Sequence, residues 1–315
     1  MVKSYERTLS DLNQVENFLK NVLHLPADPQ YNRYASLVTT AALANLGITN
    51  RDTLHYTNFR SRPYLSDDAR VELRKTIYNE LITQKRLKCD DDITLHNGGV
   101  LPVTTLQKNR TAFYVIGLPA SGKSGISNKI ADNFGAIILD CDYAKRKFPE
   151  YEASAAYGAS ALHEESSVVI FGGGNGPYAA EPSVLQYAVE QGYNIVIPKI
   201  GDVADKVVAF ARGLLELNYT IHLILVRLDR EEATRRALYR FIETGRYVPL
   251  QLIFDVYGND PTITFFDLFL DKCSCFSSYT MISSDVSIGQ PKKLIFSSEN
   301  SPITEDLLTE EVKKQ

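Results

Sequence analysis

The stretch TAFYVIGLPASGKS at residues 111–124 decides the fold of this chain. The apolar run 111–116 has the length and composition of a buried strand. The run 117–124 that follows satisfies the pattern G-x-x-x-x-G-K-[ST], and the residues from Lys123 onward suit a helix. A strand, a glycine-rich turn and a helix in this order predict a phosphate loop; the alternative is a chance match in an ordinary glycine-rich turn.

Each residue of this loop has a task in binding a nucleotide. The glycines let backbone N–H groups turn inward around a phosphate, and the helix N-terminus adds a partial positive charge. Lys123 can reach the β and γ phosphates, and the Ser124 hydroxyl can hold Mg²⁺. We therefore expect ATP or GTP to bind here with Mg²⁺. The candidate nucleotide-binding residues are Gly117, Pro119, Ala120, Ser121, Gly122, Lys123 and Ser124.

Length and composition limit the classes of protein to consider. A chain of 315 residues predicts one large α/β domain with an accessory domain. The net charge of −4 argues against a dedicated nucleic-acid binder, and no stretch of about 18 apolar residues predicts a membrane span. Four cysteines without zinc-ligand spacing and no apolar leader predict a cytoplasmic protein, or one delivered into a target cell if it is an effector.

Strands and helices alternate beyond the phosphate loop. Apolar runs at 136–139, 194–197 and 220–228 are separated by helical stretches at 183–191, 203–217 and 230–243. This alternation predicts an α/β fold with a P-loop kinase-like parallel sheet flanked by helices. Before the loop, apolar residues at helical spacing predict helices at 9–23, 34–46 and 67–87.

These patterns divide the chain into four segments. We expect a small helical accessory domain at 1–92, a junction hairpin at 93–110, the kinase domain at 111–296 and a tail with a short helix at 297–315. The dipeptide Asn97-Gly98 supports the hairpin, because both residues tolerate positive φ angles.

Two acids, Asp140 and Asp142, follow the second predicted strand. The carboxyl ends of parallel strands face the ligand crevice, so both acids are expected near the phosphates if this strand neighbours the first. Phosphoryl transfer needs a carboxylate that accepts or orients the hydroxyl proton, and groups that hold a metal. Asp142 is the candidate base and Asp140 the candidate support for Mg²⁺; the alternative is that both only cap the end of the strand.

Four arginines lie in or just after the predicted helix at 230–243. They are Arg235, Arg236, Arg240 and Arg246. Gly245 can end the helix and return Arg246 toward the cleft that Arg240 faces. Guanidinium groups suit the charge of a transferring phosphoryl group, whereas a surface arginine is usually only a solvated charge. The residues alone leave both interpretations open.

Further motifs occur in a definite order along the chain. They are LDCDY at 139–143, FPEY at 148–151, HEESS at 163–167, RFIETGRYVP at 240–249 and VYGNDPT at 256–262. With the phosphate loop, they make residues 111 to about 295 resemble the zeta-toxin kinases of bacterial toxin–antitoxin systems. The resemblance implies transfer of phosphate from ATP or GTP to a sugar hydroxyl of UDP-N-acetylglucosamine.

The resemblance also implies a role for particular residues. Asp142 resembles the family's catalytic base, and Arg240 and Arg246 resemble the arginines that hold the transferred phosphate. Lys123 and Ser124 resemble the phosphate lysine and the metal hydroxyl. The candidate acceptor-binding residues are His163, Glu164, Ser167 and Lys199.

The acceptor side departs from the family pattern. The best-described branch has Glu, then Thr and Arg two and four residues on, whereas this chain has PKIGD at 198–202. A pocket that pairs polar substrate groups rejects wrong partners strongly, so altered residues imply an altered acceptor. A kinase of the ribose of NAD or of another nucleotide therefore remains an alternative. A nucleotide-binding switch with little turnover is a further alternative, although a protein that only binds a nucleotide needs no catalytic base such as Asp142.

The helices at 1–92 lie outside the resemblance. In toxin systems a separate helical antitoxin blocks the nucleotide site, and some single-chain relatives carry an inhibitory helical segment. The resemblance therefore implies a helical antitoxin partner or inhibition in cis by 1–92. A domain that completes the core or binds an unrelated partner is the alternative. The expected ligands are a nucleotide and a small-molecule acceptor, with no nucleic acid and no membrane.

Overall fold

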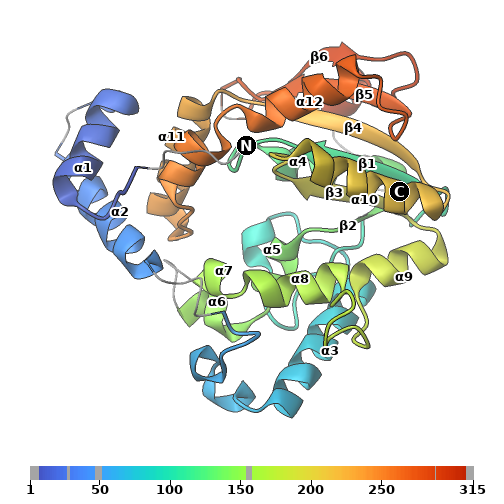
Figure 1. Ribbon diagram of the computed structural model, residues 1–315, viewed down its shortest axis with the longest axis horizontal. Helices are drawn as coiled ribbons and strands as arrows, with labels where there is room; N and C mark the ends of the chain where they lie inside the picture. The colour runs from blue at the N-terminus through green and yellow to red at the C-terminus, as the bar shows by residue number, and fades with distance from the viewer. Residues whose placement is uncertain (1–6, 27–28, 47–51, 154–157, 288, 310–315) are drawn as a thin grey trace.

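A six-stranded sheet forms the centre of the molecule (Figure 1). The computed structural model describes residues 7–26, 29–46, 52–153, 158–287 and 289–309. The strand order is β2-β3-β1-β4-β5-β6. The strands are β1 (Thr111–Ile116), β2 (Ala136–Ile138), β3 (Asn194–Lys199), β4 (Thr220–Arg227), β5 (Ser278–Ser283) and β6 (Lys293–Ser297).

The strands from β2 to β5 pair in parallel, and β6 adds an antiparallel edge. The interior of β1 and β4 is buried without interruption, as expected for parallel strands covered on both faces. The predicted parallel sheet flanked by helices is therefore confirmed. The edge strand β6 was not predicted, because its alternate residues Lys293, Ile295 and Ser297 are exposed and its apolar run is short.

Helices cover both faces of the sheet. Phe113 packs against Phe134 of α4 (Lys123–Phe134), with ring centroids 4.7 Å apart, and the next residue, Tyr114, packs against Phe210 of α10 (Ala204–Glu216). Successive residues of β1 therefore point to opposite helical layers. Helix α13 (Glu305–Thr309) packs beside α4, and α12 (Asp260–Leu270) packs beside α10.

A second group of helices follows β2 and lies beneath the sheet in Figure 1. It consists of α5 (Cys141–Lys145), α6 (Pro149–Ala153), α7 (Gly158–Ala161), α8 (His163–Phe171) and α9 (Val184–Gln191). Helix α3 (Asp67–Thr83) packs against α5, α8 and α9 from outside. Its N-cap Ser66 accepts a hydrogen bond from the Ala69 N–H.

The N-terminal helices divide between two hydrophobic cores. Helix α1 (Leu12–Asn17), the π-helix η1 (Phe18–Val22) and α2 (Tyr31–Asn45) pack beside α11 (Arg230–Thr244), at the left of Figure 1. The buried residues of α3, in contrast, belong to the core of the sheet. Whether 1–92 is a separable domain stays a prediction, but its third helix shares the kinase core.

In place of the predicted pair of strands, the segment 93–110 takes part in two isolated bridges, Thr94 with Asn97 and Leu101 with Lys85. The N–H groups of Val100 and Leu101 donate to the carbonyl oxygens of Leu81 and Gln84, at the end of α3. The second arm of the predicted hairpin therefore pairs with α3 and not with the first arm.

Short helices complete the described chain. They are the 3₁₀ turns η3 (Thr57–Phe59), η4 (Arg62–Tyr64) and η5 (Asp90–Asp92), and the π-helix η6 (Leu252–Tyr257). Across the described ranges, no helix combines the length and the apolar character needed to cross a membrane.

Candidate active site

The phosphate loop joins β1 to α4, which begins at Lys123 as the sequence predicts. A Cβ atom at Gly117 would lie 2.5 Å from the carbonyl oxygen of Val226 on β4, which leaves no room for a side chain. Gly122 has a φ of +81°, in the left-handed region that favours glycine. The tight turn into α4 therefore explains why the motif has glycine at both positions.

Lys123 is folded back onto this loop. Its ammonium donates to the carbonyl oxygens of Gly117 and Leu118, each at 2.7 Å. Burial lowers the pKa of Lys123 to about 8. The neighbouring charges that act on it are Asp140, Arg240, Asp142 and Arg246. The residues predicted to be catalytic, although far apart in sequence, therefore lie close enough to influence one lysine.

The other loop residues differ in their exposure. Ser121 is fully buried, and its hydroxyl oxygen has no hydrogen-bond partner in the part of the chain that the structure describes. Ser124 is exposed in the first turn of α4, and Pro119 and Ala120 are half-buried. A buried hydroxyl without a partner is rare in proteins, and inside a phosphate loop a ligand oxygen can supply the missing partner.

The two acids reach the site from one strand further away than expected. They follow β2, and β3 lies between β2 and β1. The Asp140 carboxylate accepts a hydrogen bond from the Asp142 N–H at 2.9 Å, and so caps α5. The interpretation as a cap therefore applies to Asp140 and does not apply to Asp142.

Asp142 lies at the centre of a group of cations. Its carboxylate forms ion pairs with Arg246 and, at 3.2 Å, with Lys145. Burial alone would raise the pKa of Asp142, but Arg246, Lys145 and Arg146 hold it well below its usual value. Burial and the charge of Asp142 raise the pKa of Asp140. The same strand end thus carries one carboxylate that stays ionised and one that protonates more readily.

The two predicted phosphate-binding arginines differ in their partners. Gly245 ends α11 with a φ of +74°, and Arg246 then reaches Asp142. Arg240 forms no ion pair with any described residue, and its buried Nε has no acceptor. Burial and the charge of Arg246 lower the pKa of Arg240 to about 10. Arg240 thus has no partner among the described residues, and the neighbouring Arg246 shares the Asp142 carboxylate with Lys145. The positive charge of the two guanidinium groups therefore attracts an anion.

The other two arginines of α11 hold parts of the fold together. Arg235 Nε donates to the Leu23 carbonyl oxygen at 3.0 Å, and Arg236 Nη1 donates to the Ser284 carbonyl oxygen at 3.0 Å. Arg235 therefore binds the N-terminal helices, and Arg236 binds the loop between β5 and β6.

The candidate acceptor-binding residues of the HEESS motif lie on α8. His163 and Glu164 are exposed in its first turn, and Ser167 is half-buried one turn further on. Desolvation by the surrounding chain and the charge of Lys145 lower the pKa of His163. His163 is therefore mostly neutral at pH 7 and can donate or accept a hydrogen bond.

Lys199, at the end of β3, faces the same helix. Its Nζ lies 3.6 Å from the centre of the Phe171 ring, at the end of α8. Burial lowers the pKa of Lys199, and the nearby Cys141 and Asp140 partly offset this effect. This lysine has no carboxylate in contact among the described residues, so its charge is available to a ligand.

The sequence analysis did not single out Lys145. Lys145 contacts Asp142 directly and affects the pKa of both His163 and Lys199. Its spacing of three residues from Asp142 on a helix would have been the signal, because residues three apart share a helix face. Two lysines, Lys145 and Lys199, thus lie near the segment that carries the two acids.

The residues present fit a magnesium ion of the kind that kinases use. Such an ion takes one or two protein oxygens, and waters and substrate phosphates complete its coordination. The exposed Ser124 hydroxyl and the Asp140 carboxylate are oxygen donors of the right type at the phosphate loop. The described ranges contain no cluster of three or more His, Cys, Asp or Glu side chains that would form a protein-only metal site.

A phosphate loop at the carboxyl edge of a parallel sheet defines a nucleotide-binding protein of the P-loop kinase class. The family model for zeta toxin matches residues 100–262, which is just over half of the chain. The chain belongs to the zeta toxin family. It is thus a kinase-type phosphotransferase that binds a nucleotide.

One solved structure supports the same fold. A structure from the PezAT chromosomal toxin–antitoxin system of Streptococcus pneumoniae is 15% identical, with 79% of this chain and 90% of that chain covered and a TM-score of 0.51. The AvrRxo1-ORF1:-ORF2 structure with ATP is 14% identical, with 87% and 73% covered and a TM-score of 0.43. A search of curated proteins gives no match. At these identities the first structure is evidence of the fold alone.

Proposed function

We propose that this protein transfers the γ-phosphate of ATP or GTP to a hydroxyl of a nucleotide sugar such as UDP-N-acetylglucosamine. The observation that carries the proposal is the ion pair between Arg246 and Asp142, together with the charges of Lys123 and Arg240, which also interact with Asp142. Three cations beside one ionised carboxylate match the needs of phosphoryl transfer, in which charge spreads over the transferred group while a carboxylate receives the acceptor proton.

The residues divide the reaction between them. The Asp142 carboxylate accepts a hydrogen bond from the acceptor hydroxyl and takes its proton as the oxygen bonds to phosphorus. The bond from the γ-phosphorus to the bridging oxygen breaks, and the nucleoside diphosphate leaves. Lys123, Arg240 and Arg246 stabilise the charge on the phosphoryl oxygens. Mg²⁺ held by Ser124 and Asp140 would neutralise part of the charge on the donor phosphates.

Arg246 contacts two different groups in this scheme, the Asp142 carboxylate and the transferred phosphoryl group. In the structure it pairs with Asp142, and in the reaction it contacts the phosphoryl group. Lys145, which also pairs with Asp142, can retain the carboxylate when Arg246 turns toward the phosphate. Donor binding therefore frees Asp142 from one cation and raises its basicity at the moment when a base is needed.

The acceptor is expected to be an anion. Lys145 pairs with Asp142, Lys199 adds a second positive charge near Asp140, and His163 is a hydrogen-bonding group near both lysines. A diphosphate-bearing acceptor suits such a site. Both UDP-N-acetylglucosamine and NAD have a diphosphate, so the ribose of NAD is the second candidate acceptor.

We also propose that the N-terminal helices restrain the kinase in the manner of an antitoxin. Residues of α1, η1 and α2 share one hydrophobic cluster with residues of α11, which carries Arg240, and with Leu118 of the phosphate loop. The hydrogen bond from Arg235 to Leu23 and the ion pair between Arg7 and Asp255, at 2.7 Å, hold these helices in place. A separate helical antitoxin on the same surface is the alternative.

The experiment measures transfer of ³²P from γ-labelled ATP and GTP to UDP-N-acetylglucosamine and to NAD. We expect labelled UDP-N-acetylglucosamine with the unchanged protein, and none with Lys123→Ala. Label in NAD alone would make NAD the acceptor in place of UDP-N-acetylglucosamine, and the proposed kinase activity would stand. No donor consumption with either acceptor, together with tight nucleotide binding, would favour a nucleotide-dependent switch. Full activity of Asp142→Asn would overturn the assigned base.

A further inference from the structure

A second lysine reaches the phosphate loop from the other end of the sequence. Lys292 lies at the end of the loop 284–292, which joins β5 to β6. A Cβ atom on Gly122 would lie 3.0 Å from Lys292 Cε, and one on Gly125 would lie 3.2 Å from its Nζ. The Lys292 ammonium therefore lies directly against the start of α4.

The loop that carries Lys292 is anchored from two sides. Arg236 on α11 donates to the carbonyl oxygens of Ser284 at 3.0 Å and Val286 at 3.3 Å. The Ser284 N–H donates to the Arg227 carbonyl oxygen, at the end of β4. Pro291 precedes Lys292 and restricts the backbone there. The position of this ammonium thus depends on contacts to the same helix that carries Arg240.

Lys292 has no anionic partner among the described residues. Its charged neighbours are the cations Lys129 and Arg236. Burial, together with these two charges, lowers the pKa of Lys292. Lys129 donates to the Leu308 carbonyl oxygen at 2.6 Å, and Arg236 is occupied by the loop and Glu232. Of these three cations, Lys292 is the one with no hydrogen bond among the described residues.

An ammonium without a partner is unfavourable at this place unless an anion joins it. The N-terminus of α4 already carries a partial positive charge, and Lys292 adds a full one. The fully buried Ser121 hydroxyl in the phosphate loop also has no partner among the described residues. Two polar groups without partners, from different parts of the chain, point to the same kind of ligand, an anion with several oxygens.

We propose that Lys292 is a second phosphate-binding lysine of the loop, whose ammonium binds the α- or β-phosphate of the donor nucleotide. This inference rests on the proposed function, because it needs a nucleotide as donor. Lys123 serves the β- and γ-phosphates, and Lys292 holds the part of the nucleotide that does not react. Its contribution is to the binding of the nucleoside diphosphate unit, both before and after transfer.

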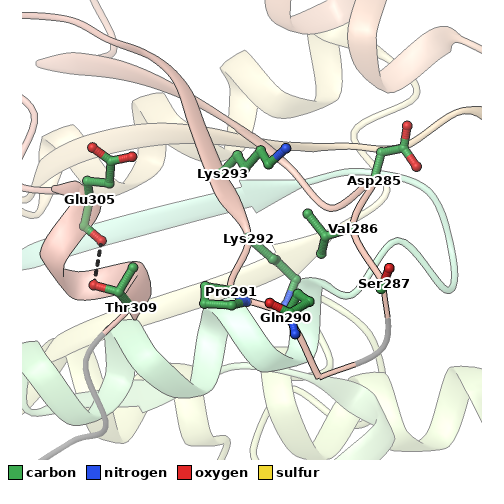
Figure 2. Close-up of a pocket in the computed structure, with 9 residues that line it drawn as sticks. All are labelled: Asp285, Val286, Ser287, Gln290, Pro291, Lys292, Lys293, Glu305 and Thr309. Carbon is green, nitrogen blue, oxygen red and sulfur yellow. Dashed lines mark hydrogen bonds between the residues drawn. The ribbon is translucent and has the colours of Figure 1, made fainter.

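A cavity beside Lys292 has room for the rest of the nucleotide. Its volume is about 620 Å³, within the range of small-molecule sites. Figure 2 shows its polar lining, to which Asp285, Ser287, Gln290 and Glu305 contribute. Lys293 lines it as well, but its side chain points away from that of Lys292, and it is exposed.

The test is the affinity of the full-length protein for ADP, for a non-hydrolysable ATP analogue and for adenosine, measured by titration calorimetry at several salt concentrations. With Lys292→Met we expect the affinity for both phosphorylated ligands to fall by about tenfold or more, since charged hydrogen bonds are strong. The salt dependence of binding should decrease, and the affinity for adenosine should be unchanged. Lys292→Arg should retain most of the binding.

Lys293→Met is the matched control, because it removes the same charge from the next residue. It should leave the affinities for ADP and adenosine unchanged. Equal ADP affinity of Lys292→Met and the unchanged protein would overturn the inference and leave the kinase proposal standing. An equal loss with Lys293→Met would also overturn it, because the effect would then be one of net charge. If the unchanged protein bound no nucleotide, both proposals would fail.

Discussion

Asp142 combines two properties that are hard to reconcile in an isolated side chain. It is largely removed from water, yet Arg246, Lys145 and Arg146 keep its pKa well below the usual value. A carboxylate held in this way is a weak base, and it serves first to orient the acceptor hydroxyl. Its basicity rises only when Arg246 turns to the phosphate.

Replacing Asp142 with Asn should therefore affect catalysis and not donor binding. We expect kcat to fall by about 10²–10⁴, the usual contribution of a general base. Donor affinity should stay equal or increase, because Arg246 loses its carboxylate partner. The measurement is kcat by phosphate transfer and donor Kd by calorimetry. Asp271→Asn, an exposed acid at the end of α12, is the matched control. A donor Kd weakened more than the control's would contradict this division of roles.

Lys123 gives the protein a pH dependence in the alkaline range. Its pKa is lowered to about 8, so the free protein loses this charge as the pH rises through 8. Donor phosphates favour the charged form, and binding therefore takes up a proton near and above that pH. We expect the affinity for ADP to fall up to tenfold per pH unit above pH 8. Lys123→Met should abolish this alkaline slope, and a slope that survived would have to arise elsewhere.

At the level of elements, α3 is attached to the acceptor helix by a buried ion network. Arg70 pairs with Glu165 at 2.6 Å and with Glu150 at 2.8 Å, and Arg74 pairs with Glu165 at 2.8 Å. Glu165 is fully buried, and Thr53 also donates to it, at 2.5 Å. Because His163 and Glu164 precede Glu165 on α8, this network also fixes the acceptor side of the site.

Removing one arginine should leave its acidic partners short of a cation. For Arg70→Met we expect a loss of about 3–5 kcal/mol in the free energy of unfolding, the usual effect of breaking a buried pair. Arg62→Met, on an exposed arginine in the same part of the chain, should change it by less than about 0.5 kcal/mol. Urea denaturation checks both. Equal stability of the two variants would mean that the network contributes little.

The same network determines how inhibition by the N-terminal helices can be tested. A chain that began near residue 92 would lose Arg70 and Arg74 together, and would leave Glu165 buried without a cation. A substitution that separates α2 from α11 keeps the network. Val38 is fully buried in the cluster between these helices, whereas Ser36 is exposed on the same helix.

We therefore expect Val38→Asp to raise the rate of phosphate transfer severalfold. A buried carboxylate without a partner disfavours the docked helices. Ser36→Asp adds the same charge on the exposed face and should leave the rate unchanged. Hydrogen exchange would report whether α1 and α2 have separated from α11. Separation without a gain in rate would show that these helices do not inhibit.

At the level of the whole molecule, the nucleotide should join parts of the chain that are far apart in the sequence. In the proposed site, cations come from the phosphate loop, from the end of α11 and from the connection between β5 and β6. A ligand present at 100 times its Kd stabilises the folded state by about 2.7 kcal/mol. We expect ADP at that concentration to raise Tm by several degrees, and Lys123→Ala to remove most of the rise. A thermal scan with and without ADP checks this.

Much of the fold could be predicted because its signals are local. The apolar runs of β1, β3 and β4 and the helices between them follow from periodicity, and the glycines of the phosphate loop follow from backbone geometry. The edge strand β6 lacked such a signal, since alternate residues are exposed. The short helices α5 to α7 were missed because each is too brief to show a period.

The candidate site follows the same division. The sequence by itself determined the phosphate loop and the pair Asp140 and Asp142, because a motif of adjacent residues can be recognised without knowledge of distant contacts. It could not decide which arginines of α11 face the site. In the tertiary structure Arg246 pairs with Asp142 and the charge of Arg240 interacts with it, whereas Arg235 and Arg236 hold the N-terminal helices and the loop between β5 and β6.

Only the tertiary structure also brought in residues from outside every motif. Lys145 was identified by its ion pair with Asp142. Arg70 was identified by its buried hydrogen bond to Glu165, which lies 95 residues away in the chain. Lys292 lies against the phosphate loop because β5 and β6 complete the sheet there. Local sequence specifies helices, strands and turns through backbone preference and periodicity. Which distant charges meet is decided by packing, which no short stretch of sequence contains.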